Sequence, residues 1–269
     1  MPATVTASGA AAESAPKLAM LRISGADARR FLQGQLSNDM DLLSADRLLC
    51  AGLHSPQGRV LALLWLTARS ASEIFVLLPA ELAATAVNTL RRFVLRAKVN
   101  IEIVPMSTLI AALPGAPAAT VAARVQAIAN GQPQIYAASS GQFIAQMLNL
   151  DCLGAISFTK GCYTGQEVIA RAHYRGRVKR RMQRFATTDA LPPTPGTTLH
   201  FADGRSAQLV DSVTLTDGSY EFLAVAPLPV AAGSTTTSSK ASDTPDTTAA
   251  SGAVSISCRP LPLPYTLPQ

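Results

Sequence analysis

Residues 160–167 read KGCYTGQE, and the rest of this chain is best interpreted outward from that stretch. Thr164 followed by Glu167 fits a capping box, in which the Thr hydroxyl accepts a hydrogen bond from one free amide and the Glu carboxylate accepts from another. Helix-forming residues follow, and the apolar ones among them recur at helical spacing. The stretch therefore predicts a helix over residues 165–173.

Cys162 lies two residues before the predicted helix cap. A helix start presents unpaired N–H groups and a partial positive charge, and Lys160 adds a full charge nearby. Both favour a thiolate over a thiol, so Cys162 is a candidate reactive thiol and Lys160 its candidate catalytic partner. Two other interpretations stay open. Cys162 is a buried packing residue in one of them, and the helix start binds a ligand carboxylate or phosphate in the other.

The stretch belongs to a longer one, NLDCLGAISFTKGCYTGQEVIAR, over residues 149–171. This sequence resembles the signature of the YgfZ family, folate-binding proteins related to the glycine-cleavage T protein, and the cysteine of that signature matches Cys162. The resemblance implies a T-protein-like fold, tetrahydrofolate or a derivative as cofactor, and a role in maturing or repairing iron–sulfur proteins. It also implies iron–sulfur assembly proteins or client iron–sulfur enzymes as partners. The residues that it places at the cofactor are Asn149, Asp151, Gly161, Tyr163, Gly165, Gln166, Glu167, Arg124 and Arg171.

One position departs from the family pattern. Arg124, Gly131 and Pro133 match the family's Arg-…-Gly-x-Pro segment, but Ala129 stands where relatives commonly carry a glutamate. In the T-protein relatives that glutamate contacts the pterin ring, so the resemblance does not define how a folate is oriented here. Trp65, the only tryptophan, is expected in the core or on a sheet face, and a role as a stacking platform for a pterin stays open.

The composition describes a globular protein, since 48% of the 269 residues are hydrophobic and 15% are charged. No apolar run approaches the roughly 18 residues that a membrane-spanning helix requires. Residues 1–16 contain neither the basic start and apolar core of a secretory signal nor the arginines of a mitochondrial presequence. We therefore expect a disordered leader over 1–16 and a cytoplasmic, bacterial protein with no membrane partner.

The cysteines are scattered. Four are present, and no two of them form the C-x-x-C pair of a structural zinc site. A disulfide between Cys152 and Cys162 stays open, although a cytoplasmic setting argues against it. The spacing also argues against a resident iron–sulfur cluster. We therefore expect no metal site, and we expect any link to clusters to run through partner proteins.

The net charge of +6 comes from one basic segment. Residues 171–184 hold seven Lys and Arg residues and no acid, so their +7 leaves −1 for the rest of the chain. Such a segment attracts nucleic acid, an anionic cofactor or an acidic partner, or it forms a solvated strand face. Because only Tyr174 and Phe185 lie nearby to stack on bases, a cofactor or partner ranks above direct nucleic-acid binding.

Before the signature, short apolar segments alternate with helical patterns. Ser24 is a candidate cap for a first helix, and Pro79 opens a second over residues 80–96. Residues 122–129 fit either a strand or a helix. The order suits an α+β fold of ferredoxin-like antiparallel sheet layers with helices, a T-protein-like folate-binding domain over 17–190. The predicted strands are residues 18–23, 48–54, 59–67, 73–78 and 98–104.

A Pro-rich segment over residues 191–196 predicts a domain boundary. Beyond it, the resemblance implies a small C-terminal β-barrel domain over 191–269. Residues 231–253 are mostly Ser, Thr, Ala, Asp and Gly and bury too little apolar surface to fold, so they are a predicted disordered insertion. The predicted strands of this domain are residues 197–201, 207–215, 220–226 and 254–258.

Three functions are compatible with these features. The first is a folate-binding accessory factor in iron–sulfur protein maturation or repair, with any effect on tRNA modification arising indirectly through a cluster-dependent enzyme. The second is a folate-dependent aminomethyl or one-carbon transferase, but residues 58–65 carry no carboxylate where such enzymes place an essential aspartate. The third is an RNA-binding accessory protein, suggested by the basic segment.

Overall fold

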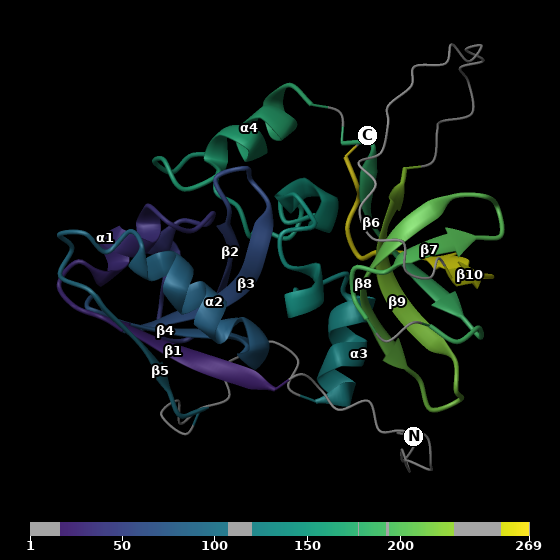
Figure 1. The fold of residues 1–269 in the computed structure, drawn as a ribbon, viewed down its shortest axis with the longest axis horizontal. Helices are drawn as coiled ribbons and strands as arrows, with labels where there is room; N and C mark the ends of the chain where they lie inside the picture. Colours follow the sequence, from purple (N-terminus) through teal and green to yellow (C-terminus); the bar gives the residue numbers. More distant parts are fainter. Residues whose placement is uncertain (1–16, 107–119, 177, 192–193, 229–253, 269) are drawn as a thin grey trace.

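The computed structural model describes residues 17–106, 120–176, 178–191, 194–228 and 254–268 (Figure 1). Two sheets, each built mainly of antiparallel strands, lie on either side of a central group of helical turns and loops. This arrangement confirms a mixed fold with antiparallel sheets. The predicted leader over 1–16 and the predicted insertion over 231–253 lie outside the described residues.

The first sheet has five antiparallel strands in the order β2-β3-β4-β1-β5. Strands β2 and β3 form a hairpin, and the Gly58 amide closes its turn by donating to the Ser55 carbonyl at 2.9 Å. All five predicted strands are confirmed to within a few residues. Their bounds are β1 (Leu18–Ser24), β2 (Leu49–His54), β3 (Val60–Ser70), β4 (Glu73–Pro79) and β5 (Asn100–Val104).

Two helices pack on one face of this sheet and share its core. Helix α2 (Ala80–Arg91) begins directly after Pro79, as predicted, but ends five residues before the predicted residue 96. Helix α1 (Ala28–Gln33) begins later than predicted. The prediction of Ser24 as its cap is wrong, because Ser24 is the last residue of β1 and pairs with both neighbouring strands.

The segment between the sheets consists mostly of helical turns and loops. Helix α3 (Val121–Ala129) settles the open choice at 122–129, and the Thr120 side chain caps it by accepting from an amide of its first turn at 3.1 Å. Helix α4 (Gln166–Tyr174) is the helix predicted over 165–173. None of the described helices is long and apolar enough to cross a membrane. Short 3-10 helices are η1 (Met40–Leu42), η3 (Ala137–Ser139) and η4 (Ala145–Leu148).

The second sheet has six strands in the order β10-β7-β8-β9-β6-β11, with only the pair β10–β7 parallel. It is curved (Figure 1), but its edge strands do not pair with each other in the described chain, so a curved sheet is confirmed and a closed barrel is not. Strand β6 precedes the predicted boundary at 191 and yet belongs to this sheet; the division into domains stays a prediction. The bounds are β6 (Arg180–Thr187), β7 (Thr198–Phe201), β8 (Ser206–Thr214), β9 (Tyr220–Pro227), β10 (Val254–Ile256) and β11 (Arg259–Leu261).

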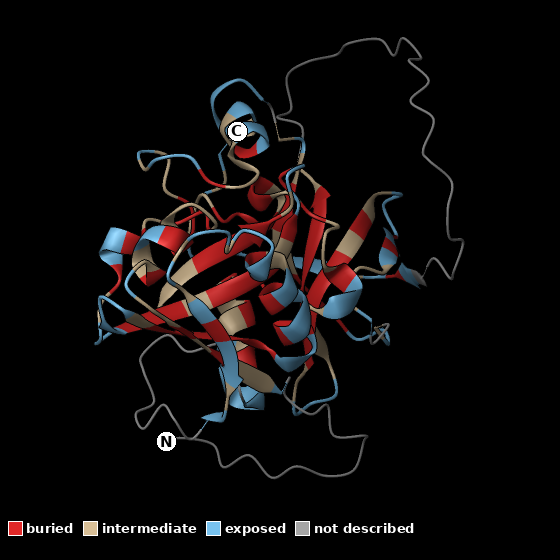
Figure 2. Cartoon of the chain, turned by 60° about the vertical axis from the view of Figure 1, so that its left-hand side comes forward, coloured by how far each residue is buried: buried red, intermediate tan, exposed pale blue. Residues whose placement is uncertain are grey.

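One hydrophobic core joins the two sheets. Leu64 and Val76 of the first sheet and Met182 and Val225 of the second belong to the same buried cluster. Figure 2 shows buried residues along the middle of the strands and exposed residues on the outer sides of the helices. Because the sheets and the segment between them pack as one body, elements far apart in sequence can shape a common pocket.

Candidate functional site

The signature starts α4 with a cap that differs from the predicted one. Gly165, with a φ of 82°, precedes the helix, and no side chain caps it, so the predicted capping box of Thr164 and Glu167 is wrong. Gln166, the first residue of the helix, closes the turn that leads into it. Its side-chain oxygen accepts from the Tyr163 amide, and its own amide donates to the Tyr163 carbonyl, both at 3.2 Å. The left-handed glycine delays the helix by one residue, which removes Thr164 from the capping position.

Gly165 is required because the signature loop packs directly on the β2–β3 hairpin. A Cβ at this position would lie 2.5 Å from the Ser55 carbonyl oxygen and 3.2 Å from the Gly58 Cα. Its positive φ also strains any residue that has a side chain. Gly165, which the resemblance places at the cofactor, therefore acts through the backbone by fixing the start of α4 against the hairpin.

Lys160 is held by backbone carbonyls. These groups lie at and just after the end of α1, where a helix leaves its last carbonyls unpaired. Burial lowers the pKa of Lys160 to about 8. Each of the three ammonium protons has a backbone acceptor, an arrangement that does not favour the predicted catalytic role beside Cys162. The three acceptors are the carbonyl oxygens of Gln33, Leu36 and Asn38, at 2.7, 2.8 and 2.7 Å from Nζ.

Tyr163 turns inward and packs beneath the signature loop. It is buried, burial raises its pKa to about 12, and Lys160 Nζ lies 5.2 Å from the centroid of its ring. The imidazole of His54 lies 6.4 Å from the same ring, centroid to centroid. Neither nitrogen of His54 has a hydrogen-bond partner within the described chain, and burial lowers its pKa to about 4. This placement makes Tyr163 a packing residue of the loop.

The remaining signature residues face outward. Gly161, Cys162, Glu167 and Arg171 are exposed, and the thiol of Cys162 is free. This exposure removes the interpretation of Cys162 as a buried packing residue. Among the described residues, no group of three or more His, Cys, Asp or Glu side chains is placed to hold a metal ion. A shallow hollow on the outer side of α4 is lined by Glu167, Ala170, Arg171, Tyr174 and Arg175.

Asn149, at the start of the signature, folds inward. It is fully buried and has a φ of 56°, a positive value that no other non-glycine residue in the described ranges adopts. Its side-chain amide donates to the Met182 carbonyl at 2.8 Å. Its own carbonyl accepts from the amides of Cys152 and Leu153, at 3.0 Å each. Asn149 therefore holds a tight turn against the second sheet and does not reach an open surface.

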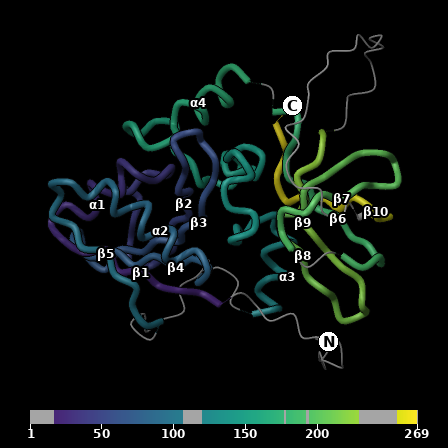
Figure 3. Tube along the Cα trace, in the orientation of Figure 1, coloured from purple at the N-terminus to yellow at the C-terminus, as the bar shows by residue number. Residues whose placement is uncertain are grey.

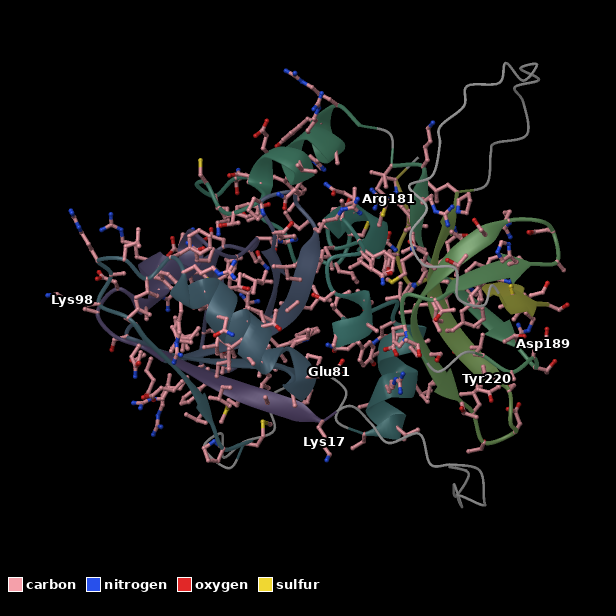
Figure 4. The ribbon with its side chains drawn as sticks, in the orientation of Figure 1. Lys17, Glu81, Lys98, Arg181, Asp189 and Tyr220 are labelled. Atoms are coloured by element: carbon pink, nitrogen blue, oxygen red, sulfur yellow. The ribbon has the colours of Figure 1, made fainter. Side chains whose placement is uncertain are left out.

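Asp151 forms a buried ion pair with Arg181 of β6, which Figure 4 labels between the two sheets. Nη1 and Nη2 of Arg181 lie 3.0 and 2.9 Å from the two carboxylate oxygens. Only 8% of the Asp151 side chain and 5% of the Arg181 side chain are exposed. A bidentate pair of this kind is strong and geometrically specific, so Asp151 ties the signature turn to the second sheet.

Arg124 is also engaged in a buried ion pair. Its Nη2 lies 2.6 Å from Oδ1 of Asp211 in β8, and the Tyr136 hydroxyl donates to the same oxygen at 3.0 Å. Burial raises the pKa of Asp211, and the charge of Arg124 opposes that rise. The structure thus uses Asn149, Asp151 and Arg124, all predicted cofactor contacts, as supports between segments.

A pocket of about 200 Å³ lies between the β2–β3 hairpin and the turn that follows Asn149. Its walls are mostly apolar, and one of them contains Trp65, the only tryptophan of the chain. None of the predicted catalytic or cofactor-binding residues lines this pocket. The lining residues are Arg47, Leu48, Leu49, Cys50, Leu63, Trp65, Gln132, Pro133, Leu150, Leu153, Gly154 and Ala155.

Sequence reasoning misses most of this lining because it comes from four separate segments. Two signals were present: Trp65 in a hairpin strand, and the family match that includes Pro133. Cys50 also belongs to the wall, and burial raises its pKa to about 12, so it serves as a packing group there and not as a nucleophile.

Clustering in the sequence leads to the expectation that the basic residues of 171–184 form one patch, and this expectation is wrong for the described residues. Arg181 is consumed by its buried ion pair, Nη2 of Arg184 lies 2.6 Å from the Glu221 carboxylate, and Arg180 donates to two backbone carbonyls. These arginines lie on β6, where partners from distant parts of the chain engage them. The described members of the segment that remain exposed and cationic are Arg171, Arg175 and Lys179.

Comparisons with known proteins agree with the fold and the signature, although no family model matches the chain. A relative from Yersinia pestis (strain Pestoides F), named tRNA-modifying protein YgfZ, is 30% identical over 77% of this chain and 81% of the relative. A relative of the same name from Klebsiella pneumoniae (strain 342) is 46% identical over 92 residues, 33% of this chain and 28% of the relative. The crystal structure of glycine cleavage system aminomethyltransferase T from Bartonella henselae matches with a TM-score of 0.58 at 14% identity, over 78% of this chain and 76% of that one. The structural likeness confirms the predicted T-protein-like fold.

Proposed function

This chain belongs to the YgfZ family, and from that premise we propose that it is a folate-binding accessory factor in the maturation or repair of iron–sulfur proteins. The name of the relatives, tRNA-modifying protein, supports an effect on tRNA modification. We place that effect downstream, through a modification enzyme that needs its cluster. The fold shared with the glycine-cleavage T protein supports tetrahydrofolate or a derivative as the ligand.

The observation that carries the proposal is the pocket between the hairpin and the signature turn. Its volume of about 200 Å³ is below the roughly 300–1,000 Å³ of pockets that enclose a whole drug-sized ligand. The pocket therefore suits one flat ring system, such as a pterin, with the rest of the ligand outside. Trp65, Leu63 and Pro133 offer apolar walls to the ring, and the exposed Arg47 offers a cation to the anionic glutamate tail.

Recognition of a pterin in this pocket would depend on shape more than on charge. The lining residues include no Asp or Glu, and Ala129 stands where T-protein relatives carry a glutamate. Gln132 offers both a donor and an acceptor to the edge of a pterin. Because aminomethyl transfer needs an acid–base group at the reacting centre and the lining supplies no carboxylate, we propose binding without this transfer chemistry.

Cys162 supplies the second part of the proposal. Its thiol is free and exposed, and it is not among the residues that line the pocket. Cysteine thiolates are the ligands that hold iron–sulfur clusters, so an exposed one suits contact with an assembly protein or a client. In this proposal folate and the protein partner bind at different places on the chain.

A complementation assay tests the proposed function. Bacteria that lack their own homologue receive the wild type, Cys162→Ala, or the control Cys258→Ala, whose half-buried thiol packs against the core of the second sheet. The activity of a 4Fe–4S enzyme is then measured under oxidative stress. We expect rescue by the wild type and by Cys258→Ala, and loss of rescue with Cys162→Ala.

The other outcomes of this assay separate the two parts of the proposal. Rescue by all three proteins keeps the pathway and makes Cys162 dispensable, which leaves folate binding as the activity. Rescue by none of them, with all three soluble and folded, contradicts the proposed pathway.

An aromatic and basic face on α4 supports a second candidate function, the direct binding of RNA. Tyr174 is 68% exposed, its ring lies 4.7 Å from that of His173, and Arg171 and Arg175 line the same hollow. Aromatic rings stack on unpaired bases, and arginines bind phosphates. Binding of tRNA that weakens steeply with salt and is lost on replacing both arginines by alanine would support this candidate. No binding by the wild type at physiological salt would exclude it.

A further inference from the structure

Residues 262–268 connect the second sheet to the segment between the sheets. They continue from β11, which pairs with β6, and in Figure 3 this yellow end of the trace runs beside the teal segment between the two sheets. Side-chain atoms of Leu263 and Tyr265 approach Gly131 closely, and a backbone carbonyl of the segment lies 4.0 Å from Sγ of Cys152. These contacts place the segment behind the pocket walls.

The hydroxyl of Tyr265 joins two residues that are far apart in the sequence. It donates to the Gly131 carbonyl at 2.9 Å and accepts from the side-chain amide of Asn149 at 3.2 Å. Since the same amide also donates to the Met182 carbonyl, both of its protons are used. Burial raises the pKa of Tyr265 to about 12, so the hydroxyl keeps its proton at neutral pH.

Gly131 and Asn149 are the residues from which two walls of the pocket start. Residues 132–133 follow the glycine directly, Leu150 follows the asparagine, and all three line the pocket. Both starting residues have left-handed backbone, with φ of 63° and 56°, so the chain changes direction at each. The Asn149 carbonyl also binds the amide of Leu153, another lining residue.

The contact between this segment and Gly131 is tight. A Cβ at residue 131 would lie 2.6 Å from the Tyr265 hydroxyl oxygen and 2.6 Å from Cδ2 of Leu263. A shift of residues 262–268 would therefore move the point at which one wall begins, and the hydrogen bond to Asn149 would transmit the shift to the other wall.

We propose that Tyr265 is a positioning residue for the pocket: its hydroxyl holds the wall that starts at Gly131 and the wall that starts at Asn149 at the spacing that a flat ring ligand requires. This inference rests on the proposed function, in which the pocket binds folate. It adds to the ligand site a residue that lies outside the signature and that does not itself line the pocket.

The test compares Tyr265→Phe, which removes only the hydroxyl, with Tyr220→Phe as a matched control. Tyr220 begins β9, away from this segment (Figure 4). Because Trp65 is the only tryptophan and lines the pocket, quenching of its fluorescence by acrylamide reports on the walls without any ligand. In Tyr265→Phe we expect a higher quenching constant and an affinity for tetrahydrofolate, measured by calorimetry, about three- to tenfold weaker than wild type. Tyr220→Phe should match the wild type.

Wild-type quenching and wild-type folate affinity in Tyr265→Phe would overturn the inference, even if Tm falls, because that combination describes a purely structural role. If the wild type binds no folate, the proposed function fails, while the quenching comparison still decides whether Tyr265 sets the walls. If Tyr265→Phe does not fold, Leu263→Ala replaces it, since this change loosens the same segment and keeps the hydroxyl. Raised quenching in Leu263→Ala supports the inference, and wild-type quenching overturns it.

Discussion

The chain uses the two halves of its signature in opposite ways. Residues 149–156 turn inward, where Asn149 is fully buried and Asp151 is engaged in a buried ion pair. Residues 161–171 lie at the surface: Cys162, Glu167 and Arg171 among them are exposed, and the buried side chains of Tyr163 and Ile169 anchor the stretch. The comparison teaches that one contiguous family signature combines residues that hold the fold with residues that are free to meet other molecules.

Lys160 marks the change from the inward to the outward half. Its three hydrogen bonds attach the loop to the end of α1. Beyond it, Tyr163 and Gly165 pack on the body of the protein, while Gly161, Cys162 and Glu167 are exposed. Burial and hydrogen-bond partners therefore distinguish the two halves, and variants in each half should fail for different reasons.

Removing the carboxylate of the inward half should have the largest effect on stability. Asp151→Ala leaves Arg181 buried without its ion-pair partner, and breaking a buried pair in this way costs about 3–5 kcal/mol of unfolding free energy. Urea unfolding followed by circular dichroism measures the loss. The control Asp203→Ala removes a solvent-exposed partner of Arg205 and should leave the unfolding free energy close to that of the wild type, because exposed ion pairs contribute little. Equal losses in the two variants would show that the inward half is no more integrated than the surface.

His54, which lies beneath the outward half of the signature, should make the stability of the protein depend on pH in the acid range. His54 packs beside Tyr163, and burial lowers its pKa from the ordinary 6.5 to about 4. Between these two values the unfolded chain binds a proton that the folded chain does not. The unfolding free energy therefore falls as the pH drops from 6.5 to 4, by about 3 kcal/mol from this group.

Urea titrations at a series of pH values measure this dependence. In His54→Leu the contribution of the buried imidazole should disappear and the curve should flatten. His200→Ala, a change at an exposed histidine of β7, should leave the wild-type dependence in place. A His54→Leu variant with the wild-type slope would assign the acid sensitivity to another group.

Replacing Lys160, which links the two halves of the signature, should have an intermediate effect on the unfolding free energy. Lys160→Met keeps most of the side-chain length but leaves three carbonyls without their donor, at a cost of about 1–3 kcal/mol. Lys98→Met, at an exposed lysine on the outside of the molecule (Figure 4), should stay within about 0.5 kcal/mol of wild type. A Lys160→Met variant as stable as wild type but inactive in complementation would restore the sequence-based prediction that Lys160 is the catalytic partner of Cys162.

Local chemistry explains which parts of the fold could be predicted from the sequence. Pro79 has its φ fixed by its ring, so the start of α2 could be placed to the residue. The hairpin turn at 55–58 carries its own Pro and Gly signals. Strand β6 was not predicted because its arginines belong to a segment interpreted as attracting an anion or a partner, and the residues that pair with them, such as Asp151 with Arg181, come from distant segments.

The candidate site could be predicted only where its residues are contiguous. The signature predicts helix α4 and the candidate reactive thiol Cys162, because the pattern behind each prediction lies in residues that are adjacent in the sequence. The pocket walls start at Gly131 and Asn149, and Tyr265 joins them from 134 and 116 residues away in the sequence. A contact over such a separation leaves no local pattern in the sequence. The resemblance therefore places Asn149 at the cofactor, whereas the structure buries its side chain between Met182 and Tyr265.

Replacing an exposed residue of the outward half should have the smallest effect on stability. The property that distinguishes this half should be the reactivity of the Cys162 thiol. Cys162→Ser changes an exposed side chain and should alter the unfolding free energy by less than about 0.5 kcal/mol. Urea unfolding measures this value beside that of Asp151→Ala. A loss comparable to that of Asp151→Ala would place Cys162 among the residues that hold the fold and would end the division of the signature into two halves.

Alkylation then separates Cys162 from the other thiols. Iodoacetamide near neutral pH, followed by peptide mass spectrometry, should modify Cys162 before Cys50, Cys152 and Cys258. The thiolate is the reactive form, and burial raises the pKa of Cys50 to about 12, raises that of Cys152 to about 11 and also raises that of Cys258. Equal rates at all four thiols would remove the case for Cys162 as the reactive group. The outward half would then be defined by exposure alone, and the search for a partner contact would move to the aromatic and basic face of α4.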